Sequence, residues 1–85
     1  MRGRRMTWRE SVASAVTRLV RRSGRRTFSR DELIQHDMTR IVEETRSHGR
    51  TPWQTLSRIL QELRDDDQIE FLEPGEYRAF KDEVR

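Results

Sequence analysis

The side chains best suited to recognise a ligand fall within one stretch, TPWQTLSRILQEL at 51–63. Its large aliphatic residues are Leu56, Ile59, Leu60 and Leu63. Their helical spacing predicts a helix with one face in a core. The remaining surface would carry an aromatic ring and polar groups of the kinds that read base edges in a DNA major groove. These candidate base-reading residues are Trp53, Gln54, Ser57, Arg58 and Gln61. An ordinary amphipathic surface helix is the alternative, and the residues alone leave both open.

The start of this helix is marked by three residues. Thr51 is a suitable N-cap, Pro52 suits the first helical position, and Gln54 completes a capping-box pattern. Free backbone N–H donors and the positive end of the helix dipole at such an end favour an anion. We therefore expect phosphate contacts near this end of the helix.

Composition limits the kind of protein this can be. The 85 residues suffice for one small domain, and 39% are charged against 32% hydrophobic. There is no cysteine, so disulfides and cysteine-based zinc sites are excluded, and a cytoplasmic location is favoured. No apolar run reaches the length of a membrane span, and no membrane partner is expected.

Charge is distributed unevenly along the chain. Residues 1–30 carry a net charge of +9 and residues 31–85 a net charge of −6. A dense basic block attracts a polyanion and makes binding depend steeply on salt, which favours nucleic acid as the partner. The candidate phosphate-binding residues are Arg25, Arg26, Arg30, Arg50, Thr51, Thr55 and Arg78. Each arginine could equally be ordinary solvated surface.

The remaining elements follow from caps and periodicity. Thr7 with Glu10 and Ser29 with Glu32 form two further capping boxes that open helices. The first helix should end near 23–24. The second carries an apolar stripe made of Leu33, Ile34, Met38, Ile41 and Val42, and a tight turn at 47–50 should lead into the third.

A short extended piece at 25–28 and a hairpin complete the expected fold. Residues 68–72 alternate as a strand, 73–76 form a Pro-Gly turn, and 77–80 return, with Tyr77 and Phe80 expected in the core. The predicted fold is α+β, a winged helix-turn-helix of three helices with a C-terminal β-hairpin wing. Residues 1–6 are expected to be a disordered basic arm, 7–80 the DNA-binding domain, and 81–85 a frayed tail or linker.

No catalytic residue, metal site or cofactor is expected, and the chain is not expected to be an enzyme. His36 and His48 lack metal-ligand spacing. Three consecutive carboxylates at 65–67 attract cations, but in a turn their side chains point in different directions.

Residues 25–80 resemble the C-terminal winged-helix domain of DpnI-type and Dam-replacing restriction endonucleases. The resemblance is carried by TPWQTLSRILQELRDDDQIEFLEPGEYR, where a T-L-S-R-x-L-Q-x-L-R-D helix runs into I-E-F-L-x-x-G-x-Y-R. It implies a module that inserts the third helix into the major groove and senses N6-methyladenine in a GATC-like site. Asp67 stands where the family often has Gly, so either this aspartate adopts the left-handed conformation or the helix ends differently. The nuclease part of the family is absent.

The resemblance thus implies a reader of methylated DNA. N6-methylation adds an apolar group to a polar base edge, so Trp53 is expected against the methyl carbon, with Gln54 or Arg58 on neighbouring bases. Such a chain would be the reader module of a modification-dependent restriction system, with a fused or recruited nuclease as a possible partner, and a monomer is favoured. Two alternatives are a homodimeric transcriptional regulator on an unmethylated operator and a protein-interaction winged helix.

Overall fold

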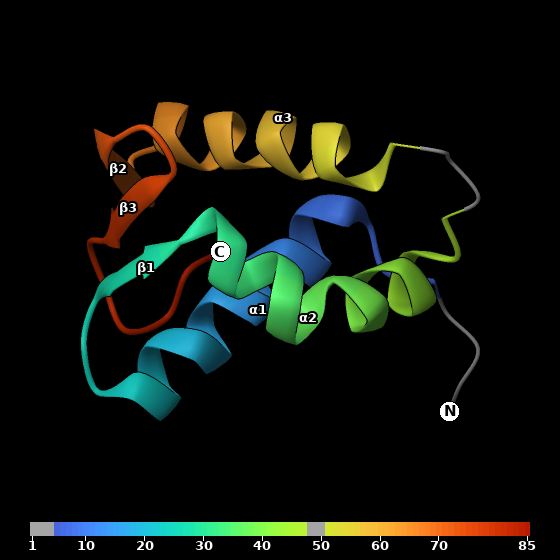
Figure 1. Ribbon diagram of the computed structural model, residues 1–85, viewed down its shortest axis with the longest axis horizontal. Helices are drawn as coiled ribbons and strands as arrows, with labels where there is room; N and C mark the ends of the chain where they lie inside the picture. Colours follow the sequence, from blue (N-terminus) through green and yellow to red (C-terminus); the bar gives the residue numbers. More distant parts are fainter. Residues whose placement is uncertain (1–4, 48–50) are drawn as a thin grey trace.

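Three helices and three short strands alternate along the chain. The computed structural model describes residues 5–47 and 51–85. Its elements are α1 (Trp8–Ser23), β1 (Thr27–Ser29), α2 (Arg30–Thr45), α3 (Pro52–Asp65), β2 (Ile69–Glu73) and β3 (Glu76–Ala79) (Figure 1). The predicted α+β class, with three helices and a C-terminal hairpin, is confirmed. The predicted turn at 47–50 lies, apart from Ser47, outside the described residues.

Two predicted capping boxes form as expected. The Thr7 hydroxyl accepts a hydrogen bond from the Glu10 amide at 3.0 Å, and the Glu10 carboxylate accepts one from the Thr7 amide at 3.0 Å. Ser29 and Glu32 exchange the same bonds at 3.0 and 2.8 Å. The helix α1 ends where predicted, because Gly24 adopts φ 75.

The capping box predicted for α3 is absent, and that prediction was wrong. Thr51 makes no side-chain cap, although Pro52 does occupy the start of the helix. The backbone of Thr51, at φ −130 and ψ 64, differs from the extended caps of α1 and α2, so its hydroxyl is not directed at the first-turn amides. Instead, the Thr51 carbonyl accepts from the Gln54 amide at 3.0 Å.

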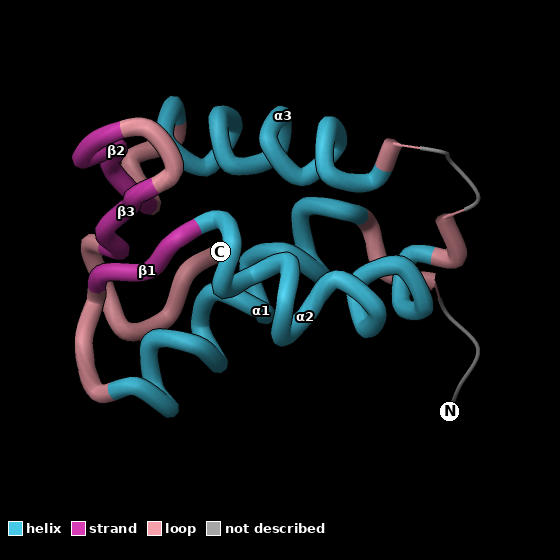
Figure 2. The backbone as a smooth tube through the Cα atoms, in the orientation of Figure 1, coloured by secondary structure: helices cyan, strands magenta, loops and turns pink. Residues whose placement is uncertain are grey.

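The hairpin and β1 form one antiparallel sheet at one end of the helices (Figure 2). The strand order is β1-β3-β2, so β3 is central. Tyr77 on β3 lies between Phe28 on β1 and Phe71 on β2, with ring centroids 5.3 and 5.0 Å away. This aromatic row fixes the hairpin against the strand that precedes α2.

All three helices and the sheet contribute to one core. Its largest fully buried side chains are Phe28, Leu33, Ile41, Leu56, Leu60, Leu63, Ile69, Val12 and Val16. The apolar face predicted for α3 is buried, and so are the aliphatic residues of α1. In α2 the predicted stripe is only partly buried: Leu33 and Ile41 are buried, whereas Ile34, Met38 and Val42 are half-buried. The other buried positions on this helix are Asp37, which is 5% exposed, and Thr45.

Two predictions for the C-terminal residues were wrong. Phe80 is 43% exposed, whereas Tyr77 is buried as expected. Residues 81–85 are not frayed, because Val84 is buried and its amide donates to Thr17 Oγ1 at 2.9 Å. At the other end, the Met6 amide donates to the Glu44 carbonyl at 3.0 Å, and residues 1–4 lie outside the described residues.

Of the two alternatives for Asp67, the left-handed conformation is the one observed, with φ 61. The Gln68 amide then donates to the Leu63 carbonyl at 2.9 Å, and the Asp67 amide donates to the Arg64 carbonyl at 3.0 Å. These two bonds form a Schellman motif that ends α3 and turns the chain into β2.

Candidate nucleic-acid interface

The helix α3 has one buried face and one exposed face. Trp53 is 47% exposed, and Gln54 beside it is also exposed. Arg58 and Gln61 are exposed one and two turns further along, whereas Ser57 is half-buried. In Figure 1, α3 forms one side of the molecule. Four of the five candidate base-reading side chains are therefore accessible together.

Ser57 differs from the other four because its hydroxyl is already hydrogen-bonded. It accepts from Arg30 Nε at 2.9 Å and donates to the Trp53 carbonyl at 3.1 Å. Arg30 is the first residue of α2, and its backbone amide donates to the Gly75 carbonyl in the hairpin turn at 3.0 Å. One arginine thus connects the start of α2, the turn of the hairpin and the middle of α3.

Arg58 is exposed but forms an ion pair on its own helix. Its Nη1 lies 2.7 Å from Glu62 Oε2, four residues later. Such an exposed i,i+4 pair contributes about 0.3–0.5 kcal/mol, so Arg58 can leave it at low cost.

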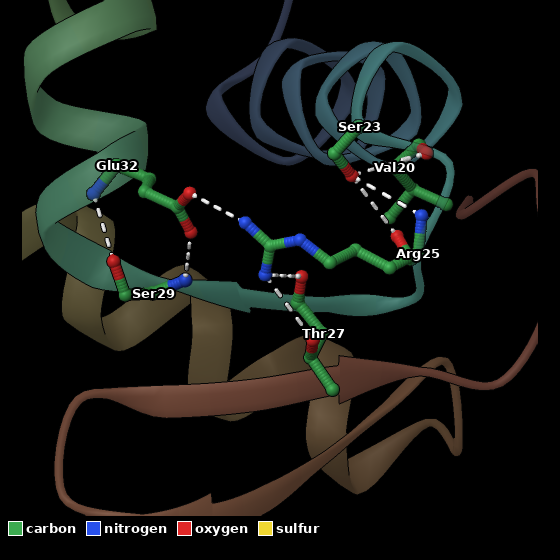
Figure 3. Close-up of polar contacts among 6 residues, drawn as sticks. All are labelled: Val20, Ser23, Arg25, Thr27, Ser29 and Glu32. Atoms are coloured by element: carbon green, nitrogen blue, oxygen red, sulfur yellow. Dashed lines mark hydrogen bonds and ion pairs between the residues drawn. The ribbon is translucent and has the colours of Figure 1, made fainter.

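Arg25 is held by several polar contacts (Figure 3). Its Nη2 lies 3.3 Å from Glu32 Oε2, and its Nη1 donates to the hydroxyl and the carbonyl of Thr27 at 3.3 and 3.4 Å. Its amide donates to Ser23 Oγ at 3.3 Å. The guanidinium therefore fixes the α1–β1 connection against the N-terminus of α2.

Arg26 is similarly engaged with the C-terminal residues. It lies 3.1 Å from a carboxylate oxygen of Asp82 and donates to the Phe80 carbonyl at 2.7 Å. The connection that carries Arg25 and Arg26 lies on the opposite side of the molecule from α3 in Figure 1. The fold therefore does not bring these two arginines together with the exposed face of α3.

Arg78, the candidate on the hairpin, pairs across the strands with Glu70. The hairpin also carries Glu73 and Glu76, so its net charge is negative. At the start of α3, Thr51 is exposed and Thr55 half-buried, whereas Arg50 lies outside the described residues. Arg30 is thus the one described arginine of the phosphate-binding set without an ion pair to a described carboxylate.

One buried charged pair was missed in the sequence. Arg18 Nη2 on α1 lies 3.0 Å from Asp37 Oδ1 on α2, and the Asp37 side chain is 7% exposed. The signal was available, because Asp37 lies four residues from both Leu33 and Ile41 and therefore on their face of the helix.

No metal centre forms within residues 5–47 and 51–85, where no three potential ligands gather. Asp65 pairs with Arg64, and Asp66 pairs with Arg9. His36 is exposed, and His48 lies outside the described residues. In the same part of the chain, no helix combines the length and apolarity needed to cross a membrane.

Comparison of the chain with protein-family models, with curated proteins and with solved structures returned no match. The function must therefore be argued from the residues and their arrangement.

Proposed function

We propose that the chain binds double-stranded DNA as a winged-helix module and places α3 in the major groove. The order of helices and strands, with β1 added to a C-terminal hairpin, is compatible with such an arrangement. The observation that carries the proposal is the exposed pair Trp53 and Gln54 on the first turn of α3. An indole left about half exposed at a helix end, next to an amide, suits a base edge that has apolar and polar parts.

The target we propose is N6-methyladenine in a GATC-like site. Trp53 would contact the methyl carbon, and Gln54 and Arg58 would bond neighbouring base edges. Burying one methyl group is worth about 0.8 kcal/mol, which corresponds to about a fourfold preference per methylated strand. The proposed biological role is the reader of a modification-dependent restriction system, with the nuclease supplied by a fused or recruited partner.

Tryptophan fluorescence tests this proposal directly. The chain has two tryptophans, and Trp8 on α1 is half-buried against the core. The variant Trp8→Phe therefore leaves Trp53 as the sole reporter. Titration with methylated, hemimethylated and unmethylated GATC duplexes should quench it in that order of affinity. The same series at two salt concentrations separates base recognition from phosphate attraction.

A second variant identifies the methyl contact. Trp53→Ala, followed by anisotropy of labelled duplexes, should remove the preference for methylated DNA and leave salt-dependent binding largely intact. Equal loss of both would assign Trp53 a structural role. Equal affinity of the parent chain for all three duplexes would instead favour the alternative of a regulator that reads an unmethylated operator.

A further inference from the structure

The junction of α2, α3 and the hairpin turn has the features of a site for a single phosphate group. Its central group is Arg30, whose backbone amide is bonded to Gly75 and whose Nε is bonded to Ser57. The terminal nitrogens of Arg30 make no hydrogen bond to any residue in the described part of the chain. Ser57 therefore holds the Nε edge of the guanidinium, and the terminal nitrogens are left to donate hydrogen bonds to a ligand.

Among the described residues, no carboxylate forms an ion pair with Arg30 at this junction, although Glu76 in the hairpin carries an opposite charge that also acts on Tyr77. Arg25, Arg26, Arg58 and Arg78 each lie within ion-pair distance of a carboxylate. Arg30 has no such partner among the described residues, and it is half-buried. Its positive charge also acts on Tyr77, whose pKa is raised by burial and lowered in part by Arg30. A half-buried guanidinium with free donors is suited to bidentate contact with a phosphate.

We propose that Arg30 binds one phosphodiester of the duplex at this junction, and that Ser57 holds the guanidinium rather than reading a base. This inference rests on the proposed binding of DNA. Because Ser57 also donates to the Trp53 carbonyl, the same bonds link the phosphate contact to the first turn of α3. Of the two candidates Arg30 and Arg78, the proposal favours Arg30, because Arg78 is paired with Glu70.

The salt dependence of binding measures this contact. Each phosphate contact contributes about 0.9 to the slope of log K against log salt concentration. Arg30→Ala should lower that slope by about 0.9 and weaken binding to methylated and unmethylated duplexes by the same factor. Arg30→Lys should preserve the slope, because it keeps the charge. Ser57→Ala should preserve the slope and the methyl preference but weaken binding to all duplexes by the same factor, because the guanidinium loses the bond that positions it.

Arg22→Ala is the matched control. It removes the same unit of charge from an exposed arginine at the end of α1, away from α3, and should leave the slope unchanged.

If the parent chain shows no salt-dependent binding, the proposed function itself fails. If it binds but Arg30→Ala keeps the parent slope, or Arg22→Ala lowers the slope equally, only the Arg30 contact is refuted. A change of base or methyl preference in Ser57→Ala would also refute it. Arg30→Gln, which removes the charge and keeps a donor for Ser57, takes the place of Arg30→Ala if that variant does not fold.

Discussion

Substitution of Arg18 should lower the free energy of unfolding more than substitution of Asp37, although both break the same ion pair. The Asp37 side chain is 7% exposed and the Arg18 side chain 31% exposed. The second carboxylate oxygen, Asp37 Oδ2, is buried and accepts no hydrogen bond from any described residue. Removing Arg18 leaves a buried charge without a partner, whereas removing Asp37 leaves an arginine that can reach water.

The magnitudes follow from that asymmetry. Loss of one partner from a fully buried pair costs about 3–5 kcal/mol, and exposed pairs contribute about 0–1 kcal/mol. Since Arg18 is partly solvated, we expect Arg18→Met to lower the free energy of unfolding by about 2–3 kcal/mol. Methionine retains an aliphatic stem, so little packing is lost. Asp37→Ala should cost only about 1 kcal/mol, because it also removes the unbonded oxygen.

Urea unfolding followed by circular dichroism would measure these values. For a chain of this size, 1 kcal/mol corresponds to a shift in Tm of about 4–8 °C, so thermal unfolding would separate the two variants as well. The double variant Arg18→Met/Asp37→Ala should be close in stability to Asp37→Ala alone. The reasoning is refuted if Asp37→Ala is the more destabilising single variant, or if the two single effects simply add.

Three further predictions concern caps and acid stability. Ser29→Ala removes the side-chain acceptor of the α2 capping box and should cost about 1 kcal/mol in thermal or urea unfolding, with Ser14→Ala on α1 as a surface control. Asp67→Gly relieves a left-handed aspartate and should stabilise the fold by up to about 1 kcal/mol; a loss of stability would contradict the strain argued here. Burial raises the pKa of Glu44, but hydrogen bonds from Arg40 and Ser11 outweigh it, so its pKa lies below the ordinary value of a glutamate. The stability that Glu44 contributes is therefore present above the unfolded-state pKa and lost as the pH falls through the folded-state pKa. Glu44→Gln should flatten that part of the curve of stability against pH, and an unchanged acid limb would show that other carboxylates dominate it.

Local sequence signals predicted the helices well. The caps at Thr7 and Ser29 require only groups three residues apart, and the apolar faces require only helical periodicity. The same signal failed at Thr51, because a cap also depends on the backbone of the cap residue, and Thr51 lacks the extended ψ of Thr7 and Ser29.

Errors in the hairpin and tail have different causes. Tyr77 and Ala79 face the core with the period of two expected of a strand, so Phe80 falls on the other side. Strand alternation should have placed it there. The burial of Val84 could not have been anticipated in this way, because it depends on a contact with Thr17, 67 residues away.

The same distinction between local and distant contacts applies to the candidate site. The exposed face of α3 follows from the sequence, and so does the i,i+4 pair of Arg58 with Glu62. The bond from Arg30 to Ser57 joins residues 27 apart and appears only when α2 and α3 pack. The sequence therefore predicted which α3 side chains are exposed, but not which of them is hydrogen-bonded to another element of the fold.

The charge asymmetry of the sequence overstates the positive charge that the folded chain can offer to DNA. Four arginines from residues 1–30 form ion pairs with carboxylates from the acidic part of the chain; these pairs are Arg9–Asp66, Arg18–Asp37, Arg25–Glu32 and Arg26–Asp82. Folding thus uses much of the basic block to hold α1, the α1–β1 connection and the C-terminal residues together. Under the proposed function, arginines in exposed pairs could still leave them at low cost, whereas Arg18, whose partner Asp37 is buried, would not, so the salt slope of binding should be smaller than the charge of the basic block alone predicts.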